Sequence, residues 1–245
     1  MAEKVEAAEK EKKIPTIDYK YIIKLPSGET RTFAVQLEEE TLNLRFPHRT
    51  ALPDWTALSY KQCPNCPLNE KESPRCPAAV SIADIVETFS TSISHDEVLV
   101  RVESPERVYE KKVPLQKVLS GLIGLLMAAS GCPVTGKLKP LVRHHLPFSN
   151  LEETQFRILS MYLMAQYLRV KNGKEADWSL ETLQKIYDEI RTVNSSFFNR
   201  VLGNVKGDAN PNALVILGAF TEAIAFSTKG MMLETLEQIY KTYLE

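Results

Sequence analysis

The sequence predicts an α+β protein in which antiparallel hairpins form a small N-terminal sheet and a helical bundle follows in the C-terminal half. Strand-like alternation of apolar and polar residues occurs only before residue 114, and helical spacing of apolar residues prevails after it. Strands that precede helices favour α+β over an alternating fold with a parallel sheet. The 245 residues are 44% hydrophobic and 25% charged, which is close to globular averages and excludes a disordered or fibrous protein.

Two hairpins account for most of the predicted sheet. A turn signal, Pro26-Ser27-Gly28-Glu29, separates the first two alternating segments, and Ser104-Pro105-Glu106 separates the last two. The alternation also continues beyond the first hairpin, which predicts a third strand there. The expected strands are residues 17–25, 33–37, 42–46, 98–102 and 108–113.

One helix is expected between the hairpins and several after them. Pro114 suits a first helical position, where its missing N–H costs nothing. Ser149 and Glu152 have the spacing of a capping box. Apolar stripes and the Asn210-Pro211 pair mark the later helices. The expected helices are residues 78–89, a helix from Pro114, one from Ser149, residues 183–201, one from Asn210 and a last one over residues 233–243.

Three regions follow from these elements. Residues 1–13 alternate Glu and Lys and are expected to be a disordered charged tail; residues 14–113 form the β-rich part with a Cys-Pro loop, and residues 114–245 form the helical part. We expect the last two to pack as one domain. The net charge of −1 lacks the basic excess of a nucleic-acid binder. A protein partner or a homo-oligomer remains open.

The chain is expected to be cytoplasmic, with no membrane partner. Its first residues lack the apolar region of a secretory signal. The longest apolar run, residues 118–129, is shorter than the ~20 residues that span a bilayer. Disulfides are rare in a reducing compartment, so clustered cysteines there more often bind metal or perform redox chemistry.

All four cysteines are followed by proline. Residues 47–77 contain six prolines and three of the cysteines without a sustained period, which predicts a loop held by something other than secondary structure. Cys63 and Cys66 form a CxxC pair, which places two sulfurs on one tight turn, and Cys76 and Cys132 can arrive from elsewhere in the fold. Four thiolates complete a zinc shell or hold an iron–sulfur cluster. The sequence therefore predicts a shared metal site of Cys63, Cys66, Cys76 and Cys132.

The sequence does not decide between an iron–sulfur cluster and Zn²⁺, although it narrowly favours the cluster. Zinc knuckles usually combine two CxxC pairs, whereas this chain combines one pair with two solitary Cys-Pro steps. A redox dithiol at Cys63 and Cys66 is a second interpretation, although the βαβ context of thioredoxin-like motifs is missing. A third is that Cys132 is simply a small apolar residue beside a packed helix.

The favoured function is an accessory, electron-carrying or sensing metal protein, because no general base or nucleophile pair accompanies the cysteines. The alternative is a metal- or thiol-dependent enzyme, with an open coordination position near Cys132 and His144 or His145. The segment from Gly131 to Leu138 resembles a phosphate-binding loop, but Leu138 cannot bind magnesium as Ser or Thr does, which excludes that reading.

Several short elements together resemble an uncharacterised bacterial family, a domain of unknown function. They are CPNCPL at residues 63–68, SGCP at residues 130–133, HLPF at residues 145–148 and the helix at residues 161–168. The likeness extends over most of residues 17–225. It implies that these elements belong to one fold, and it implies no activity, cofactor or catalytic residue.

Overall fold

The computed structural model describes residues 14–45, 51–227 and 236–245, and its four named strands form one antiparallel sheet. The strands are β1 (Thr16–Lys24), β2 (Thr30–Glu38), β3 (Glu97–Glu103) and β4 (Val108–Pro114). Their order in the sheet is β2-β1-β3-β4, so the two predicted hairpins join through β1 and β3. In the register, Tyr21 lies opposite Phe33 on one side and Val102 on the other.

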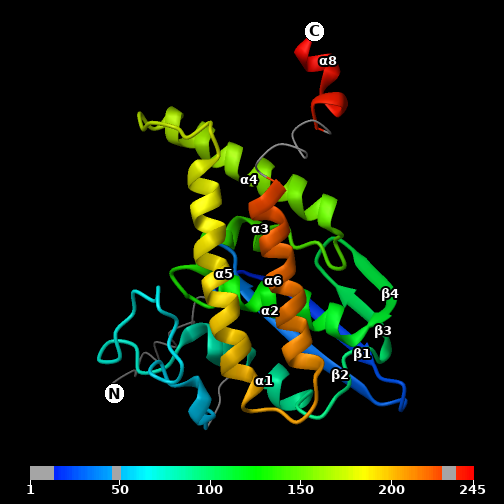
Figure 1. The fold of residues 1–245 in the computed structure, drawn as a ribbon. Coiled ribbons are helices and arrows are strands. Elements are labelled where there is room, and N and C mark those ends of the chain that lie inside the picture. Colours follow the sequence, from blue (N-terminus) through cyan, green and yellow to red (C-terminus); the bar gives the residue numbers. More distant parts are fainter. Residues whose placement is uncertain (1–13, 46–50, 228–235) are drawn as a thin grey trace, which may run out of the picture.

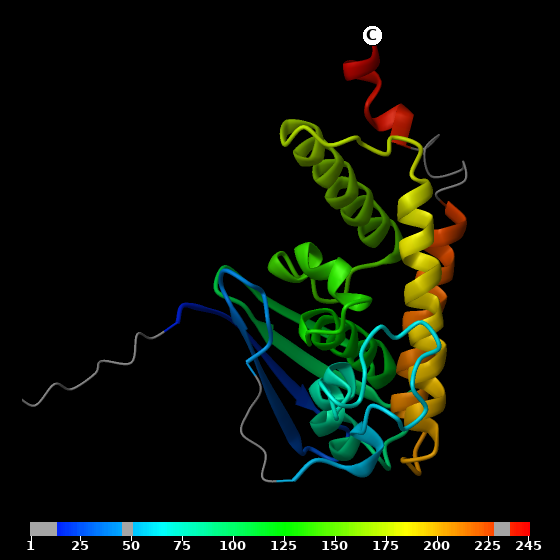
Figure 2. The same cartoon turned by 90° about the vertical axis from the view of Figure 1, so that its left-hand side faces the viewer.

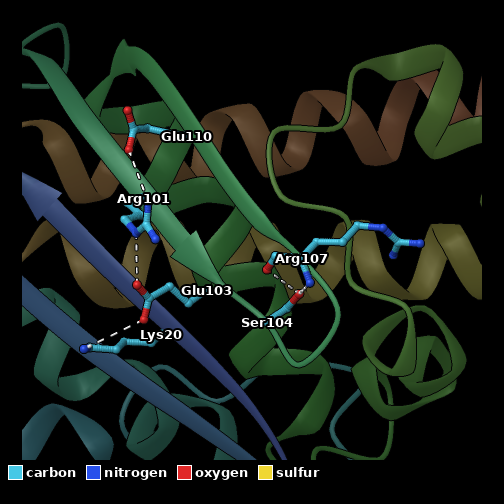
Figure 3. Close-up of polar contacts among 6 residues, drawn as sticks. All are labelled: Lys20, Arg101, Glu103, Ser104, Arg107 and Glu110. Carbon is cyan, nitrogen blue, oxygen red and sulfur yellow. Dashed lines mark hydrogen bonds and ion pairs between the residues drawn. The ribbon is translucent and has the colours of Figure 1, made fainter.

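The two faces of the sheet differ in chemistry because side chains alternate along each strand. Tyr19, Tyr21 and Ile23 of β1 point inward and are buried. Figure 3 shows the opposite face, where a row of ion pairs crosses three strands. The row joins Lys20 to Glu103 at 3.9 Å, Glu103 to Arg101 at 2.9 Å and Arg101 to Glu110 at 3.7 Å. Such exposed pairs contribute little stability, so the buried face holds the sheet in place.

Part of the helical half covers the buried face of the sheet, and the rest extends beyond it (Figures 1 and 2). The helical elements are η1 (Asp54–Thr56), α1 (Pro77–Thr88), α2 (Leu115–Ala129), η2 (Thr135–Leu138), α3 (Lys139–Arg143), α4 (Leu151–Lys171), α5 (Glu181–Leu202), α6 (Ala209–Ser227) and α8 (Lys241–Leu244). Helix α2 lies between the sheet and the α5–α6 pair, and most of its side chains are buried. This central position explains why its sequence is apolar on nearly every side.

The predicted α+β class, both hairpins, and the helices at residues 78–89 and 183–201 are confirmed. No helix in the described ranges combines the length and apolar character that a membrane crossing requires. Residues 1–13, expected to be a charged tail, lie outside the described residues, as does Phe46.

The third predicted strand is wrong. Only an isolated bridge between Leu37 and Leu44 extends the first hairpin among the described residues. Leu42 adopts a left-handed conformation, with φ of 55°, which breaks the extended backbone that a strand needs. The N–H of Leu44 then donates to the carbonyl of Ala129 at 2.9 Å. The chain therefore leaves the sheet toward the end of α2.

The capping box of α4 lies one residue later than predicted. Asn150 is the N-cap: its side chain accepts a hydrogen bond from the N–H of Glu153, and the Glu153 carboxylate accepts one from the N–H of Asn150, both at 2.8 Å. Ser149 instead contacts the hydroxyl of Thr154. Pro114 ends β4 and stands immediately before α2.

Candidate metal centre

The loop that carries three of the cysteines is closed at its base by backbone hydrogen bonds. The N–H of Cys76 donates to the carbonyl of Thr56 at 2.8 Å, and the N–H of Leu58 donates to the carbonyl of Pro74 at 3.0 Å. Residues 58–74 therefore leave and return at one point. Cys76 lies at this base and is the N-cap of α1, as its position before Pro77 predicts.

The CxxC pair forms a tight turn beside helix α5. The N–H of Cys66 donates to the carbonyl of Cys63 at 3.0 Å, which closes the turn. The side-chain amide of Asn65, at its tip, donates to the carbonyl of Glu189 in α5 at 3.0 Å. The predicted turn is thus held against α5 by its own central residue.

The start of the loop contacts the C-terminal end of α5, and the cyan segment then bulges away from this helix in Figure 1. The Lys61 ammonium donates to the carbonyl of Asn199 at 2.6 Å. The side-chain amide of Asn204 donates to the hydroxyl of Tyr60 at 3.1 Å. The sequence predicted no secondary structure in this loop. Hydrogen bonds at its base and with α5 hold it in place instead.

The segment with Cys132 reaches the same helix from α2. Gly131, with φ of 94°, makes the turn that takes the chain out of α2, a conformation that glycine adopts without strain. The N–H of Cys132 donates to the hydroxyl of Ser130 at 3.2 Å. Lys137 then forms an ion pair with the carboxylate of Glu189, whose carbonyl also holds Asn65. One residue of α5 thus contacts both cysteine-bearing segments.

A buried arginine lies under this region. Arg200 of α5 is 1% exposed, and its guanidinium donates to the carbonyls of Trp55 at 2.7 Å, Ala57 at 2.8 Å and Leu58 at 3.4 Å. The ring of Tyr60 lies 5.8 Å from its central carbon. The Nε atom is buried and has no hydrogen-bond partner among the described residues. One donor of this cation is therefore unsatisfied.

The thiols and Arg200 influence one another electrostatically. Burial raises the pKa of Cys63 to about 11; the Ser196 hydroxyl opposes this shift, and the neighbouring Cys76 and Cys132 add to it. Burial also raises the pKa of Cys76, and the amide of Ala79 in α1 and the charge of Arg200 oppose that shift. Burial lowers the pKa of Arg200, while Cys76, Cys63 and Cys66 favour its charged form. Cys63 is therefore a protonated thiol at neutral pH in this structure.

The four predicted ligands are free cysteines, three in the loop and one in the segment after α2, and Cys63, Cys76 and Cys132 influence one another electrostatically. Cys76 is buried and the other three are half-buried. Within the described residues, however, no three His, Cys, Asp or Glu side chains are placed to hold a metal ion. The described residues therefore form no coordination shell.

The two histidines of the alternative site have other surroundings. The Nε2 atom of His145 lies 2.5 Å from the hydroxyl of Tyr21, and its ring meets that of Tyr19 edge-on at 5.5 Å. Burial lowers the pKa of His145 to about 3, and the positive charge of Arg157 adds to this shift. His144 is exposed, and its carbonyl accepts a hydrogen bond from Arg157. His145 therefore packs as a neutral ring against β1.

Sequence reasoning missed Arg200. A signal existed, because Arg200 follows Val193 by seven residues and so lies on the apolar face of the predicted helix. Charged residues are rarely fully buried unless they are paired, so a cation on that face predicts a cluster of acceptors opposite it. The acceptors are carbonyls of the proline-rich segment, which no residue-type motif would reveal.

A family model described as a domain of unknown function (DUF6901) matches residues 17–241. The predicted resemblance to an uncharacterised family is confirmed over nearly the whole chain. No curated protein and no solved structure matches the chain.

Proposed function

The chain belongs to the DUF6901 family, whose function is unknown, and from the chemistry of its cysteine region we propose that it is a metal-binding protein. Cys63, Cys66, Cys76 and Cys132 are the proposed ligands. An iron–sulfur cluster is narrowly favoured over zinc, because one CxxC pair is combined with two solitary cysteines. The role is accessory, electron-carrying or sensing.

The observation that supports this proposal most strongly is the unsatisfied Nε atom of Arg200. A metal ion or cluster with four thiolate ligands carries a net negative charge, which is costly to bury without a cation nearby. Arg200 is a buried cation whose pKa responds to three of the cysteines. A thiolate sulfur would accept the hydrogen bond that Nε lacks, and such bonds to sulfur tune both cluster potentials and zinc sites.

The raised thiol pKa values link metal binding to proton release. A metal binds the thiolate form, so Cys63 and Cys76 must each lose a proton as the site fills. Apparent affinity is therefore expected to increase with pH. Because no shell is formed among the described residues, binding would draw the sulfurs together between the two anchors of the loop, its base at Thr56 and its contact with Glu189.

The enzyme alternative receives no specific support. It requires His144 or His145 to stand beside Cys132 as a ligand or a general base. The ring of His145 instead contacts Tyr19 and Tyr21 of β1, and a pKa of about 3 makes it a weak base at neutral pH. The binding role is therefore the one we carry forward.

The test is anaerobic purification followed by analysis of iron, sulfide and zinc and by a visible absorption spectrum. We expect brown protein that contains iron and sulfide and loses both in the Cys132→Ser variant. The matched control is Glu72→Gln, which changes an exposed residue of the same loop and should keep the metal.

Colourless protein with about one zinc per chain would indicate that the site is a tetrahedral zinc site and holds no iron–sulfur cluster. Protein that contains neither metal, and that binds neither zinc nor iron with sulfide on anaerobic reconstitution, would contradict the proposal.

A further inference from the structure

Helix α4 exposes apolar side chains on the face that its neighbours leave open. Its inner face, with Ile158, Leu159 and Tyr162, packs on α5 and α6. The outward apolar side chains are Phe156 (44% exposed), Leu163 (41%), Met164 (58%), Tyr167 (58%), Leu168 (47%) and Val170 (52%). A large exposed apolar patch of this kind marks an interaction surface.

Five outward positions of α4 form a straight stripe, which we call the α4 seam. They alternate at spacings of four and three residues and are Phe156, Ser160, Leu163, Tyr167 and Val170. This alternation is the repeat with which two helices pack along their lengths. The seam therefore has the pattern of a helix–helix contact. Among the described residues, the C-terminal segment lines a groove with only Phe156, Ser160 and Leu163 of the seam, and Tyr167 and Val170 lie outside that groove.

The seam borders an open apolar groove of about 400 Å³. Phe156 and Leu163 line one wall, and Leu236 and Tyr240 of the C-terminal segment line the other. Trp178, in the connection from α4 to α5, completes the lining and is 61% exposed. The groove can take the side chains of a helix laid along the seam.

We propose that the seam binds the α4 helix of a second copy of this chain, antiparallel, about a two-fold axis between residues 161 and 162. That axis brings Phe156 against Tyr167 of the partner subunit and Ser160 against Leu163 of the partner subunit. Each groove thereby receives the partner's Tyr167 beside Phe156. The small Ser160 leaves room for the bulkier leucine opposite it.

The charges at the two ends of α4 identify the second copy as the partner. Glu152 and Glu153 lie in the first turn, and Arg169 and Lys171 lie in the last turn. An antiparallel pair places Glu152 opposite the partner's Lys171, and symmetry repeats this contact at the other end. Opposite charges at both ends set the orientation, because a parallel pair would place like charges together.

The size of the patch indicates a weak dimer. Phe156, Tyr167 and Trp178 are about half exposed, which corresponds to roughly 300 Å² of aromatic surface at 150–250 Å² per full side chain. With the aliphatic residues of α4, two copies would bury roughly 1,000 Å², the lower limit for a specific interface. The dimer should therefore form at micromolar concentrations and separate on dilution.

The oligomeric state of the full chain tests this proposal by sedimentation and light scattering at tens of micromolar. We expect a dimer, and a monomer for Tyr167→Glu. The control Val108→Glu places the same charge on an exposed residue of β4 and should leave the dimer intact. Trp178 supplies a second readout, because the other tryptophan, Trp55, is 6% exposed. Emission should shift to longer wavelength on dilution, and Trp178→Phe should abolish the shift.

A charge exchange tests the antiparallel register. Glu152→Lys and Lys171→Glu should each weaken the dimer, because each places like charges opposite one another, and the double variant should restore it. Near-UV circular dichroism confirms that each variant is folded. A wild-type monomer at tens of micromolar, a dimer that survives Tyr167→Glu, or a double variant that is not restored would overturn the proposal.

Discussion

Replacing Arg200 by methionine should cost more stability than any other single charge removal in α5. Methionine keeps much of the apolar volume but leaves the buried carbonyl of Trp55 without a donor and the carbonyl of Ala57 with only the N–H of Tyr60. A hydrogen bond to a charged group contributes about 1.5–3 kcal/mol. The two short bonds therefore correspond to about 3–6 kcal/mol, and release from the desolvation of the buried cation excludes the upper end of this range, which leaves a net loss of about 3–5 kcal/mol.

Urea unfolding followed by the fluorescence of buried Trp55 measures this loss. In a chain of this length, the same change corresponds to a melting temperature lower by roughly 6–20 °C. Arg191→Met is the matched control: the Arg191 side chain is 51% exposed and pairs only three residues away with Asp188, so its removal should cost at most about 1 kcal/mol. A loss below about 1 kcal/mol for Arg200→Met would show that the loop does not depend on this cation.

Two further predictions concern other parts of the fold. The pKa of His145 is about 3 in the folded chain and 6.5 in the unfolded chain. Between these pH values only the unfolded chain binds a proton at this residue, so the free energy of unfolding should decrease as the pH falls from 6.5 to about 3. Urea titrations at several pH values should show a flatter profile for His145→Gln than for the wild type. Gly207→Ala should cost about 3 kcal/mol or more in thermal unfolding, because the new Cβ would lie 2.3 Å from the carbonyl oxygen of Ser92. Gly218→Ala, which meets nothing within 4 Å inside a helix, should instead stabilise by about 0.5–1 kcal/mol.

Local patterns predicted most of the elements, and long-range contacts decided what the patterns missed. The hairpins followed from alternation and turn residues, which depend only on neighbours in sequence. The pairing of β1 with β3 joins residues about 80 apart, and no local pattern encodes it. The strand expected at residues 42–46 failed for the same reason, because Leu44 bonds to Ala129 at the end of α2. The capping box moved by one residue because Ser149 and Asn150 both precede a glutamate by three.

The candidate site was also only partly predictable from local sequence patterns. The tight turn at Cys63 and the helix start after Cys76 were readable from the CxxC spacing and the Cys-Pro step. Arg200 was not, since its acceptors are main-chain carbonyls more than 140 residues away. His145 shows the opposite error: adjacency in sequence to cationic residues marked it as a candidate, but its partners are on β1.

The contact between Arg200 and the proline-rich segment also has a consequence for biosynthesis. Residue 200 is made 134 residues after Cys66, so at about 5–20 residues per second the cysteine loop waits roughly 7–27 s for the helix that covers it. During that interval the CxxC pair is exposed to the surrounding metal pool and to oxidants. The nascent chain, more than the finished protein, is therefore the form in which ions and oxidants reach these thiols most easily.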